Sequence, residues 1–454
     1  MDELQTKVYP YILGLLKNRS NSSMDTLQPL LNHLQALFKR STQKGRLFSA
    51  VILAMIIPIG SGISSQIYRK LVQIIGYSLS RTRFYRFMAS KCFNWDVIWK
   101  AIFKLIPLPL TDGRLIIALD DSTTPKSGKE IFGCEHFFDH AAKHNQSKYP
   151  WSQCFVQLGL LKFIHTRWAF LPLLTRFYHS SNKAAAECFN SKITLACQMI
   201  LKLSTWTKSP ILIVTDSWFG NGKLYNPLKD QLGNRVHILT MLRKNSVLYG
   251  FPEVIEGKTC GRPAKYGAKA GSVRDLANEY KAKAQKVTSF VYGKKRDMLV
   301  YEKNFMSKAF KCPIKVVFAY YKNHFVALAT TDLSLSVTQI LEYYSARWKI
   351  ESGFKELKHD IGSQKAQVRL EHSVINHLNM CMLAITIIWI AVMHLPSDAV
   401  NELTHNGTKP QYTFSAARKL LIKRQNKLRV CQNGESELKN HRNSWIQMII
   451  GLAA

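Results

Sequence analysis

The sequence predicts a mixed α/β protein with an all-helical N-terminal part and a β-rich insertion. Residues 1–110 repeat Leu, Ile and Phe at helical spacing, without the alternation typical of strands. From residue 111 onward, apolar strands are followed by helical segments, which indicates an α/β layer architecture. Residues 246–325 depart from this pattern with strand-like stretches rich in Lys and Gly. These three observations define the expected fold class.

The composition indicates a folded protein with a polyanionic partner. The 454 residues contain 63 Lys and Arg against 29 Asp and Glu, a formal net charge of +34. With 46% apolar and 11% aromatic residues the chain can bury a substantial core, which excludes wholesale disorder. So basic a surface repels itself unless it meets a polyanion. Nucleic acid is therefore the leading partner and a membrane surface the second.

The cysteines and apolar runs argue for a cytosolic protein. Nine cysteines, an odd number without a CxxC pair, fit reduced thiols better than a zinc ribbon or a disulfide framework. The N-terminus is too polar for a signal peptide. The apolar runs Leu47–Gly60 and Met380–Met393 are shorter than the roughly 20 residues that a membrane span needs. We therefore expect two buried helices.

Residues 64–88 have the pattern of a helix-turn-helix. An apolar helix is followed by a break at Gly76 and a second helix that carries Arg81, Arg83 and Arg86. The second helix of such a motif enters the major groove of DNA. The alternative, two ordinary packed helices with a solvated basic face, fits the pattern equally well.

Two apolar strands of the central part end in carboxylates. The stretch RLIIALDDS ends in Asp120 and Asp121, and ILIVTDS ends in Asp216. If the two strands are neighbours in a sheet, these carboxylates converge at its carboxyl edge. Further strands are expected at 154–164, 168–178, 236–243 and 324–332, with a helix at 184–203.

The insertion is strongly basic. Between Gly257 and Lys311 there are 14 basic and 4 acidic residues, interleaved with tyrosines and a phenylalanine. This interleaving favours contacts to phosphates and bases. Arg262 and Lys265 lie in GRPAKYG, which is similar to a minor-groove element and equally to a lysine-rich turn. The tail after residue 395 is basic and amphipathic.

A long helix is predicted at about Val337–His359, opened by a capping box of Ser336 and Gln339. Spacings of three or four residues place five polar side chains on one face: Tyr344, Arg347, Glu351, Lys355 and Lys358. Trp348, Phe354 and Leu357 lie off that row and are expected in the core. An exposed, salt-bridged row is the alternative.

These acids suit a metal site. Two strand-end aspartates and Glu351 could hold two Mg²⁺ ions, which prefer oxygen ligands. A two-metal site activates a water or hydroxyl and stabilises the oxygen that leaves phosphorus. Neighbouring cations would keep the acids ionised and bind the DNA backbone.

The spacing Tyr344-x2-Arg347-x3-Glu351-x6-Lys358 resembles the YREK signature of IS4-type insertion-sequence transposases. Residues 115–129, 211–222 and 330–362 resemble the three catalytic blocks of that family, in the right order. The resemblance covers roughly 110–395. On it the chain is identified as a DDE transposase of the IS4 superfamily, similar to its IS701-like members.

The resemblance implies an RNase H-like catalytic core, Mg²⁺ or Mn²⁺ as cofactor with two ions expected, and a helical DNA-binding domain before the core. It makes Asp216 the second ligand and Glu351 the third, and puts Tyr344, Arg347 and Lys358 at DNA phosphates. For the first ligand, Asp120 is favoured over Asp121, since both fit Asp-x-Ser/Thr. The expected divisions are 1–110, 111–245, 246–325, 326–395 and 396–454.

The expected activity is metal-dependent cleavage and strand transfer on double-stranded DNA. The partners would be terminal inverted repeats and target DNA, joined in a synaptic homodimer in the bacterial cytoplasm, at the nucleoid. An inactive DNA-binding derivative and a nuclease without strand transfer are the alternatives. Some relatives form a DNA hairpin with an aromatic clamp, but the insertion has no Trp between Trp218 and Trp348, so a Tyr would have to substitute. A zinc site at His136, His140 and His144 ranks lower.

Overall fold

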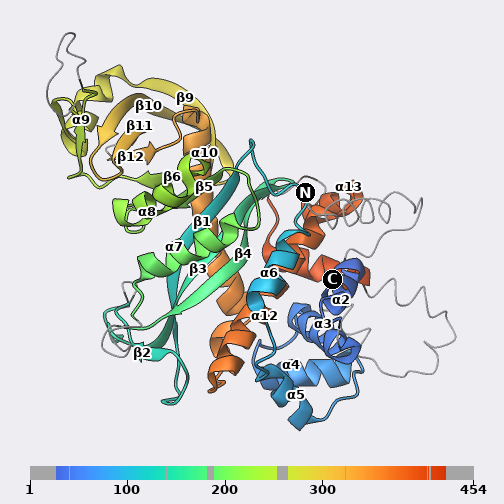
Figure 1. Ribbon diagram of the computed structural model, residues 1–454. Coiled ribbons are helices and arrows are strands. Elements are labelled where there is room, and N and C mark those ends of the chain that lie inside the picture. The colour runs from blue at the N-terminus through green and yellow to red at the C-terminus, as the bar shows by residue number, and fades with distance from the viewer. Residues whose placement is uncertain are drawn as a thin grey trace.

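One mixed sheet organises the molecule, with helices on both of its faces (Figure 1). The structure is a computed structural model, which describes residues 27–39, 41–139, 142–180, 189–252, 264–322, 324–405, 407 and 411–425. The sheet has 12 strands, in the order β2-β3-β1-β5-β6-β12-β11-β10-β7-β8, with β4 paired to β3 and β9 paired to β10. The predicted mixed α/β class is confirmed.

The central strands have the order and directions of an RNase H-like sheet. Strand β1 is antiparallel to β3 and parallel to β5, and β5 is parallel to β6. Helices cover both faces of these strands, and their sequences are therefore continuous apolar runs. The bounds are β1 Leu115–Pro125, β2 Cys134–His136, β3 Trp151–Ile164, β4 Arg167–Tyr178, β5 Ile211–Thr215 and β6 Val236–Met241.

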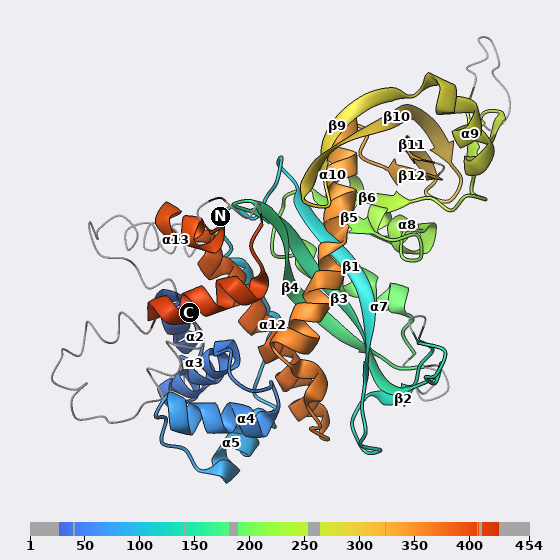
Figure 2. The ribbon, with the colours of Figure 1, turned by 180° about the vertical axis from the view of Figure 1, so that it is seen from behind.

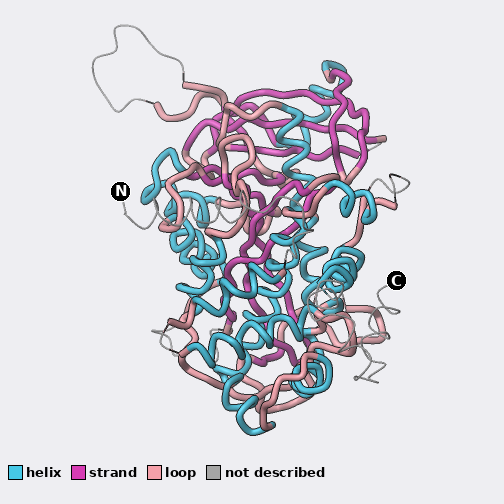
Figure 3. The backbone as a smooth tube through the Cα atoms, turned by 90° about the vertical axis from the view of Figure 1, so that its right-hand side faces the viewer, coloured by secondary structure: helices cyan, strands magenta, loops and turns pink. Residues whose placement is uncertain are grey.

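The strands of the insertion extend this sheet. Strand β12 (His324–Thr330) pairs antiparallel with β6, with Leu328 opposite Met241, and β11 pairs with β12. The other bounds are β7 Val247–Tyr249, β8 Lys269–Ser272, β9 Gln285–Val291, β10 Lys294–Ser307 and β11 Cys312–Tyr321. Figure 3 shows these strands gathered at one end of the molecule. The insertion is therefore an extension of the core sheet through its edge.

Helices that follow β4 in the chain cover the two faces of the central sheet. Helices α7 (Lys192–Ser204) and α8 (Gly222–Leu232) lie on one face, where α8 packs on β6. Helices α10 (Val337–Arg347) and α11 (Lys349–Lys355) cross the other face, on β5, β1 and β4 (Figure 2). A short helix, α9 (Val273–Tyr280), belongs to the insertion.

The described N-terminal residues before β1 are helical, without strands. They form α2 Gln28–Ala36, α3 Thr42–Ile56, α4 Ser64–Arg69, a π-helical turn Lys70–Ile74, α5 Arg81–Met88 and α6 Trp95–Phe103. Helices α3 and α5 pack on α12 (Glu371–Met393), so this part shares one continuous hydrophobic core with the sheet. After α12 come α13 (Ser397–Leu403) and a helical stretch at 414–425.

Residues 64–88 form two helices joined by a turn, as both alternatives for this segment predicted. Helix α4 continues through the π-turn to Gly76, whose positive φ of 72° turns the chain. Helix α5 then begins after Ser80, whose hydroxyl accepts a hydrogen bond from the amide of Arg83. The side chains of Arg81, Arg83 and Arg86 are all exposed.

Both apolar runs are buried helices, as expected. Helix α12 is long and apolar enough to cross a membrane, but 94% of its most apolar window is buried in the core. The first run lies within α3 and is buried from Leu47 to Ile57. The six described cysteines are free thiols, at positions 92, 134, 154, 197, 312 and 381.

Two helix predictions need correction. The helix expected at 184–203 begins only at Lys192, because Ser191 caps it by accepting from the amide of Thr194; residues 181–188 lie outside the described part. The single helix expected at 337–359 is divided at Trp348 and ends in a π-helical turn, Glu356–Asp360.

Candidate active site

Asp120 and Asp216 lie side by side at the carboxyl edge of the sheet. The parallel register of β1 and β5 runs to Ala118 opposite Val214, and each strand reaches its aspartate two residues later. Burial, and then the charge of Asp216, raise the pKa of Asp120 to about 7. Two carboxylates so close, both partly shielded from solvent, make a site that favours a cation.

Asp120 and Asp121 point to opposite faces of β1, because side chains alternate along a strand. Asp121 Oδ2 accepts from Nζ of Lys192 on α7 at 2.7 Å. Asp120 Oδ2 faces Arg347 of α10, with Nη1 at 3.8 Å. Asp120 is therefore the aspartate on the face that carries the Glu351 helix.

The turn after β5 fixes Asp216 through hydrogen bonds to its side-chain carboxylate and to its backbone carbonyl. Its Oδ1 accepts from the amides of Trp218 and Phe219 at 3.1 and 3.0 Å. Its carbonyl accepts from the amide of Gly220 at 2.9 Å and from Thr240 Oγ1 at 2.8 Å. This turn fixes the carboxylate relative to β6, the strand of Thr240.

Gly220→Ala is expected to reduce cleavage about a hundredfold without unfolding the protein. A Cβ on Gly220 would lie 1.9 Å from Thr240 Oγ1 and 2.7 Å from the carbonyl oxygen of Asp216, so the turn must shift. A shift of about 1 Å at a catalytic group costs about a hundredfold. Single-turnover cleavage measures the effect. Gly250→Ala is the control, since its Cβ has only an ordinary 3.6 Å contact. Equal rates for the two variants would contradict the prediction.

Arg347 joins two of the acids. It is buried, and its Nη2 lies 3.4 Å from Glu351 Oε1, four residues along the chain. With Nη1 near Asp120, its guanidinium lies between the first strand and Glu351, and its Nε has no hydrogen-bond partner among the described residues. Its carbon Cζ lies 5.8 Å from the Tyr344 ring. Burial raises the pKa of Tyr344 to about 12, so the phenol is protonated at neutral pH.

Lys358 also reaches the first strand. Its Nζ donates to Ser122 Oγ at 2.6 Å and to the carbonyl of Thr123 at 2.7 Å. Burial lowers its pKa. Lys355, in contrast, is exposed on the far side of α11 from buried Phe354 and Gly353. Of the predicted polar row, Tyr344, Arg347 and Lys358 therefore lie near β1 and β5. Glu351 and Lys355 are both exposed, and Glu351 is joined to this group by its ion pair with Arg347.

The expectation that Trp348 packs in the core is wrong, whereas Phe354 and Leu357 are buried as predicted. Successive helical residues point about 100° apart, so once Arg347 faces Asp120, Trp348 faces outward. Its ring is 52% exposed and lies 6.4 Å from that of Tyr292, in an edge-on contact. Tyr292 occupies the turn between β9 and β10, with a φ of +51°. The insertion thus brings an exposed tyrosine to the tryptophan beside the acids.

The donor chemistry of the site fits a hard divalent cation. Asp120 and Asp216 offer adjacent carboxylate oxygens, and Glu351 lies beyond the guanidinium that contacts Asp120. In the described chain, no three His, Cys, Asp or Glu side chains are already close enough to form a ligand set. Glu351 is instead paired with Arg347.

The other predicted residues lie apart from this group. Arg81, Arg83 and Arg86 are on α5, and Lys265 is exposed in the insertion. Arg262 and His140 lie outside the described residues. The helix required for the zinc site is absent at its described positions: His136 is in β2, with Nδ1 2.9 Å from the carbonyl oxygen of Tyr149, and His144 is in a turn.

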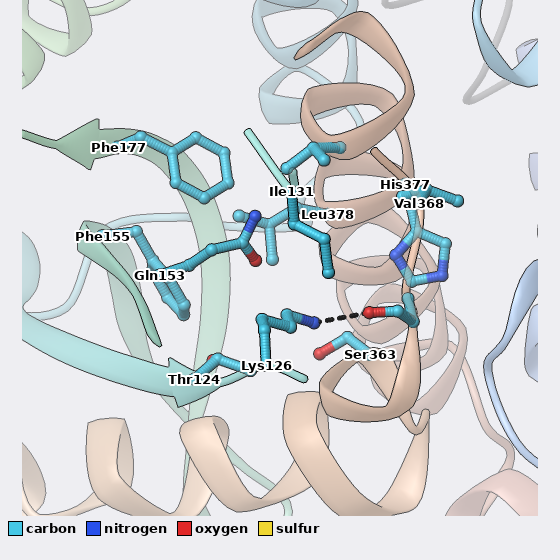
Figure 4. A pocket seen from close by; sticks show the side chains of 12 residues that line it. Thr124, Lys126, Ile131, Gln153, Phe155, Phe177, Ser363, Val368, His377 and Leu378 are labelled. Atoms are coloured by element: carbon cyan, nitrogen blue, oxygen red, sulfur yellow. Dashed lines mark hydrogen bonds between the residues drawn. The ribbon is translucent and has the colours of Figure 1, made fainter. Parts of the chain in front are cut away.

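A separate small pocket lies at the C-terminal end of β1 (Figure 4). Its volume of about 20 Å³ has room for about one water molecule. Lys126 closes it by donating to the carbonyls of Gln364 and Ala366. It is a packing feature, distinct from the acids.

Sequence reasoning missed Lys192, the partner of Asp121. Its Nζ also lies over the rings of Tyr178 and Trp218, at 5.3 and 5.8 Å. A lysine at the first position of a helix is the only local signal, and it is a weak one. The pairing depends on where α7 crosses the sheet.

In this sheet one carboxylate lies on β1 just past its pairing with β5, a second directly follows β5, and an acid lies on a helix across one face. This arrangement defines a class: enzymes with an RNase H-like fold that cut nucleic acids. The chain belongs to the DDE superfamily endonuclease family, whose model matches residues 33–296, more than half of its length. It is thus a nuclease of the transposase type, with DNA as the substrate that the family implies. No curated protein matches the chain.

Proposed function

We propose that this protein is an insertion-sequence transposase of the IS4 superfamily, similar to the IS701-like members. It binds terminal inverted repeats and carries out cut-and-paste transposition in the bacterial cytoplasm, at the nucleoid. The observation that carries the proposal is that Asp216 lies beside Asp120 and that Arg347 contacts both Asp120 and Glu351. Family membership supports it.

In this proposal Asp120, Asp216 and Glu351 hold two Mg²⁺ or Mn²⁺ ions. When bound, the ions activate the attacking oxygen and stabilise the leaving oxygen on phosphorus. Asp121, the alternative first ligand, is engaged by Lys192 on the other face, which favours Asp120. The turn after β5 keeps Asp216 oriented, and Arg347 supplies positive charge beside Asp120 for a DNA phosphate.

The surrounding side chains would bind DNA. Tyr344 as a neutral phenol donates to a phosphate, and Lys358 and Lys355 supply positive charge on either side of α11. The exposed rings of Tyr292 and Trp348 offer faces on which an unpaired base can stack. Lys265 and Arg262 would contact the backbone or minor groove from the insertion. Two protomers would synapse the two ends.

The N-terminal helices would recognise the inverted repeats. Arg83 and Arg46 line a surface hollow of about 320 Å³ beside Gly76, at the turn before α5. Replacing Arg81, Arg83 and Arg86 together should weaken DNA binding. The slope d log K/d log[salt] should become less negative, by about one for each phosphate contact that is lost. Fluorescence anisotropy from 50 to 200 mM salt measures it. An unchanged slope would mean that these residues are only a solvated basic face.

The proposal is tested on a plasmid that carries the gene with its native flanks. The full-length protein should cut at both element ends with Mg²⁺ or Mn²⁺, stop on addition of EDTA, and yield joined products with target DNA. Cuts without joined products would indicate a nuclease without strand transfer. Binding without cuts under either metal would indicate an inactive derivative, and the enzyme proposal would then be wrong.

A further inference from the structure

The side-chain amide of Gln157 is fully buried and has no hydrogen-bond partner in the described part of the chain. It lies in the middle of the apolar strand β3 and is 0% exposed. Neither its Oε1 nor its Nε2 has a hydrogen-bond partner within the described residues. A buried polar group without a partner costs stability, so its presence in this strand requires an explanation.

The register of the sheet puts Gln157 directly opposite Asp120. Residues opposite each other in an antiparallel pair project on the same face, with Cβ atoms about 5 Å apart. Gln157 is therefore the neighbour of Asp120 on the strand away from Asp216, which is on β5. Asp120 lies between the amide on one side and the second carboxylate on the other.

This is the face that carries the active-site helix. Two residues before Gln157, Phe155 packs on Phe354 of α11, with ring centroids 6.2 Å apart. Phe155 is opposite Ser122, which accepts the hydrogen bond of Lys358. The amide is thus enclosed between the sheet and the helix that follows Glu351, where solvent does not reach it.

The carboxylate of Asp120 has room for one more donor. Its Oδ1 accepts from the amide of Asp121 at 2.9 Å, and its Oδ2 has only Arg347 at 3.8 Å. A primary amide supplies a donor without a charge. It can therefore orient an ionised carboxylate without competing with a divalent cation, as a lysine or arginine in the same place would.

We infer that Gln157 is a positioning residue for Asp120: its Nε2 is the donor that holds the Asp120 carboxylate once this carboxylate turns to bind the divalent cation. The inference rests on the proposed function, in which Asp120 is the first ligand. Outer partners of this kind typically contribute 10- to 100-fold to metal affinity or activity.

The test compares Gln157→Met in the full-length protein with the wild type. In EDTA, the Tm should equal or exceed that of the wild type, because an unpartnered amide is replaced by an apolar chain of similar volume. The MnCl₂ concentration that gives half of the Mn²⁺-induced rise in Tm should increase 10- to 100-fold. Single-turnover cleavage at fixed MnCl₂ should fall by a similar factor, with unchanged DNA affinity. Gln157→Leu serves as a second apolar variant.

Gln153→Met is the matched control. Gln153 is on the same strand and face, buried, and donates to the carbonyl of Phe132 at 2.7 Å (its side chain is seen in Figure 4). This variant should have a lower Tm than the wild type in EDTA, but the same MnCl₂ concentration at half of the Mn²⁺-induced rise in Tm. An unchanged midpoint and cleavage rate in Gln157→Met would overturn the inference. A lower Tm in EDTA for both Gln157 variants would also overturn it, because the residue would then have a structural role.

The Asp120→Asn variant separates this inference from the proposed function. It should lose both the Mn²⁺-induced rise in Tm and cleavage. If Asp120→Asn keeps both, Asp120 is no ligand, and the assignment of the site fails together with the inference. If Asp120→Asn loses both while Gln157→Met behaves as the wild type, only the inference fails.

Discussion

Alanine in place of Asp216 or Glu351 is expected to reduce DNA cleavage and joining at least about a thousandfold. Each replacement removes a carboxylate that holds the catalytic ions in the proposed site. The ions stabilise the transition state by several kcal/mol, and a loss of about 4 kcal/mol corresponds to about a thousandfold in rate. Every step is phosphoryl transfer at one centre, so both variants should fail at all steps alike.

DNA binding should survive these substitutions, because it depends on basic side chains that are unchanged. The measurement is single-turnover cleavage of an end-containing duplex, beside fluorescence anisotropy for binding. Asp230→Ala on α8 is the control, since this aspartate is exposed outside the site. Cleavage at the wild-type rate by either Asp216→Ala or Glu351→Ala would refute the three-carboxylate site.

Arg418→Met is expected to lower the free energy of unfolding by about 3–5 kcal/mol. The substitution leaves several buried carbonyls without a hydrogen-bond donor, and each unsatisfied carbonyl costs about 1–3 kcal/mol. Arg418 is 5% exposed and donates to the carbonyls of Met55, Ile56 and Ile57, the last at 2.9 Å. It also donates to the carbonyl of Asp360, at the end of the π-turn after α11. One guanidinium thus joins the end of α3 to the end of the π-helical turn after α11.

Urea unfolding followed by circular dichroism measures this loss. Arg424→Met is the matched control on the same helical stretch, 414–425. Arg424 pairs with Asp398, whose side chain is 73% exposed, and exposed ion pairs contribute at most about 1 kcal/mol. If Arg418→Met were as stable as Arg424→Met, the C-terminal stretch would have no part in holding these two helix ends.

The strands were predictable wherever apolar runs were long. The stretches that became β1, β3, β4, β5, β6 and β12 are each continuous and apolar, because helices cover both faces of the sheet. The capping box of Ser336 and Gln339 was predictable too, because it depends on residues only three apart. Helix interruptions were not: no local sequence signal marks the division at Trp348, and its neighbour Arg347 contacts a strand more than 220 residues earlier.

For the site, local sequence identified the acids but not their partners. Asp120, Asp121 and Asp216 stand out because a carboxylate directly after an apolar strand is unusual in so basic a chain. Which of the first two faces Glu351 depends on the direction of β1 in the sheet, and so on its pairing with β3 and β5. Gln157 and Tyr292 acquire their places only through strand register and the fold of the insertion.

The sequence by itself determined the α/β class, the buried helices, the basic character and the candidate acids, because each depends on composition or on spacing along the chain. Only the tertiary structure decided that the insertion continues the core sheet, that Arg347 lies between Asp120 and Glu351, and that Trp348 is exposed. Such contacts join residues far apart in the chain. Their geometry depends on the packing of the whole sheet, and a short window of sequence carries no information on it.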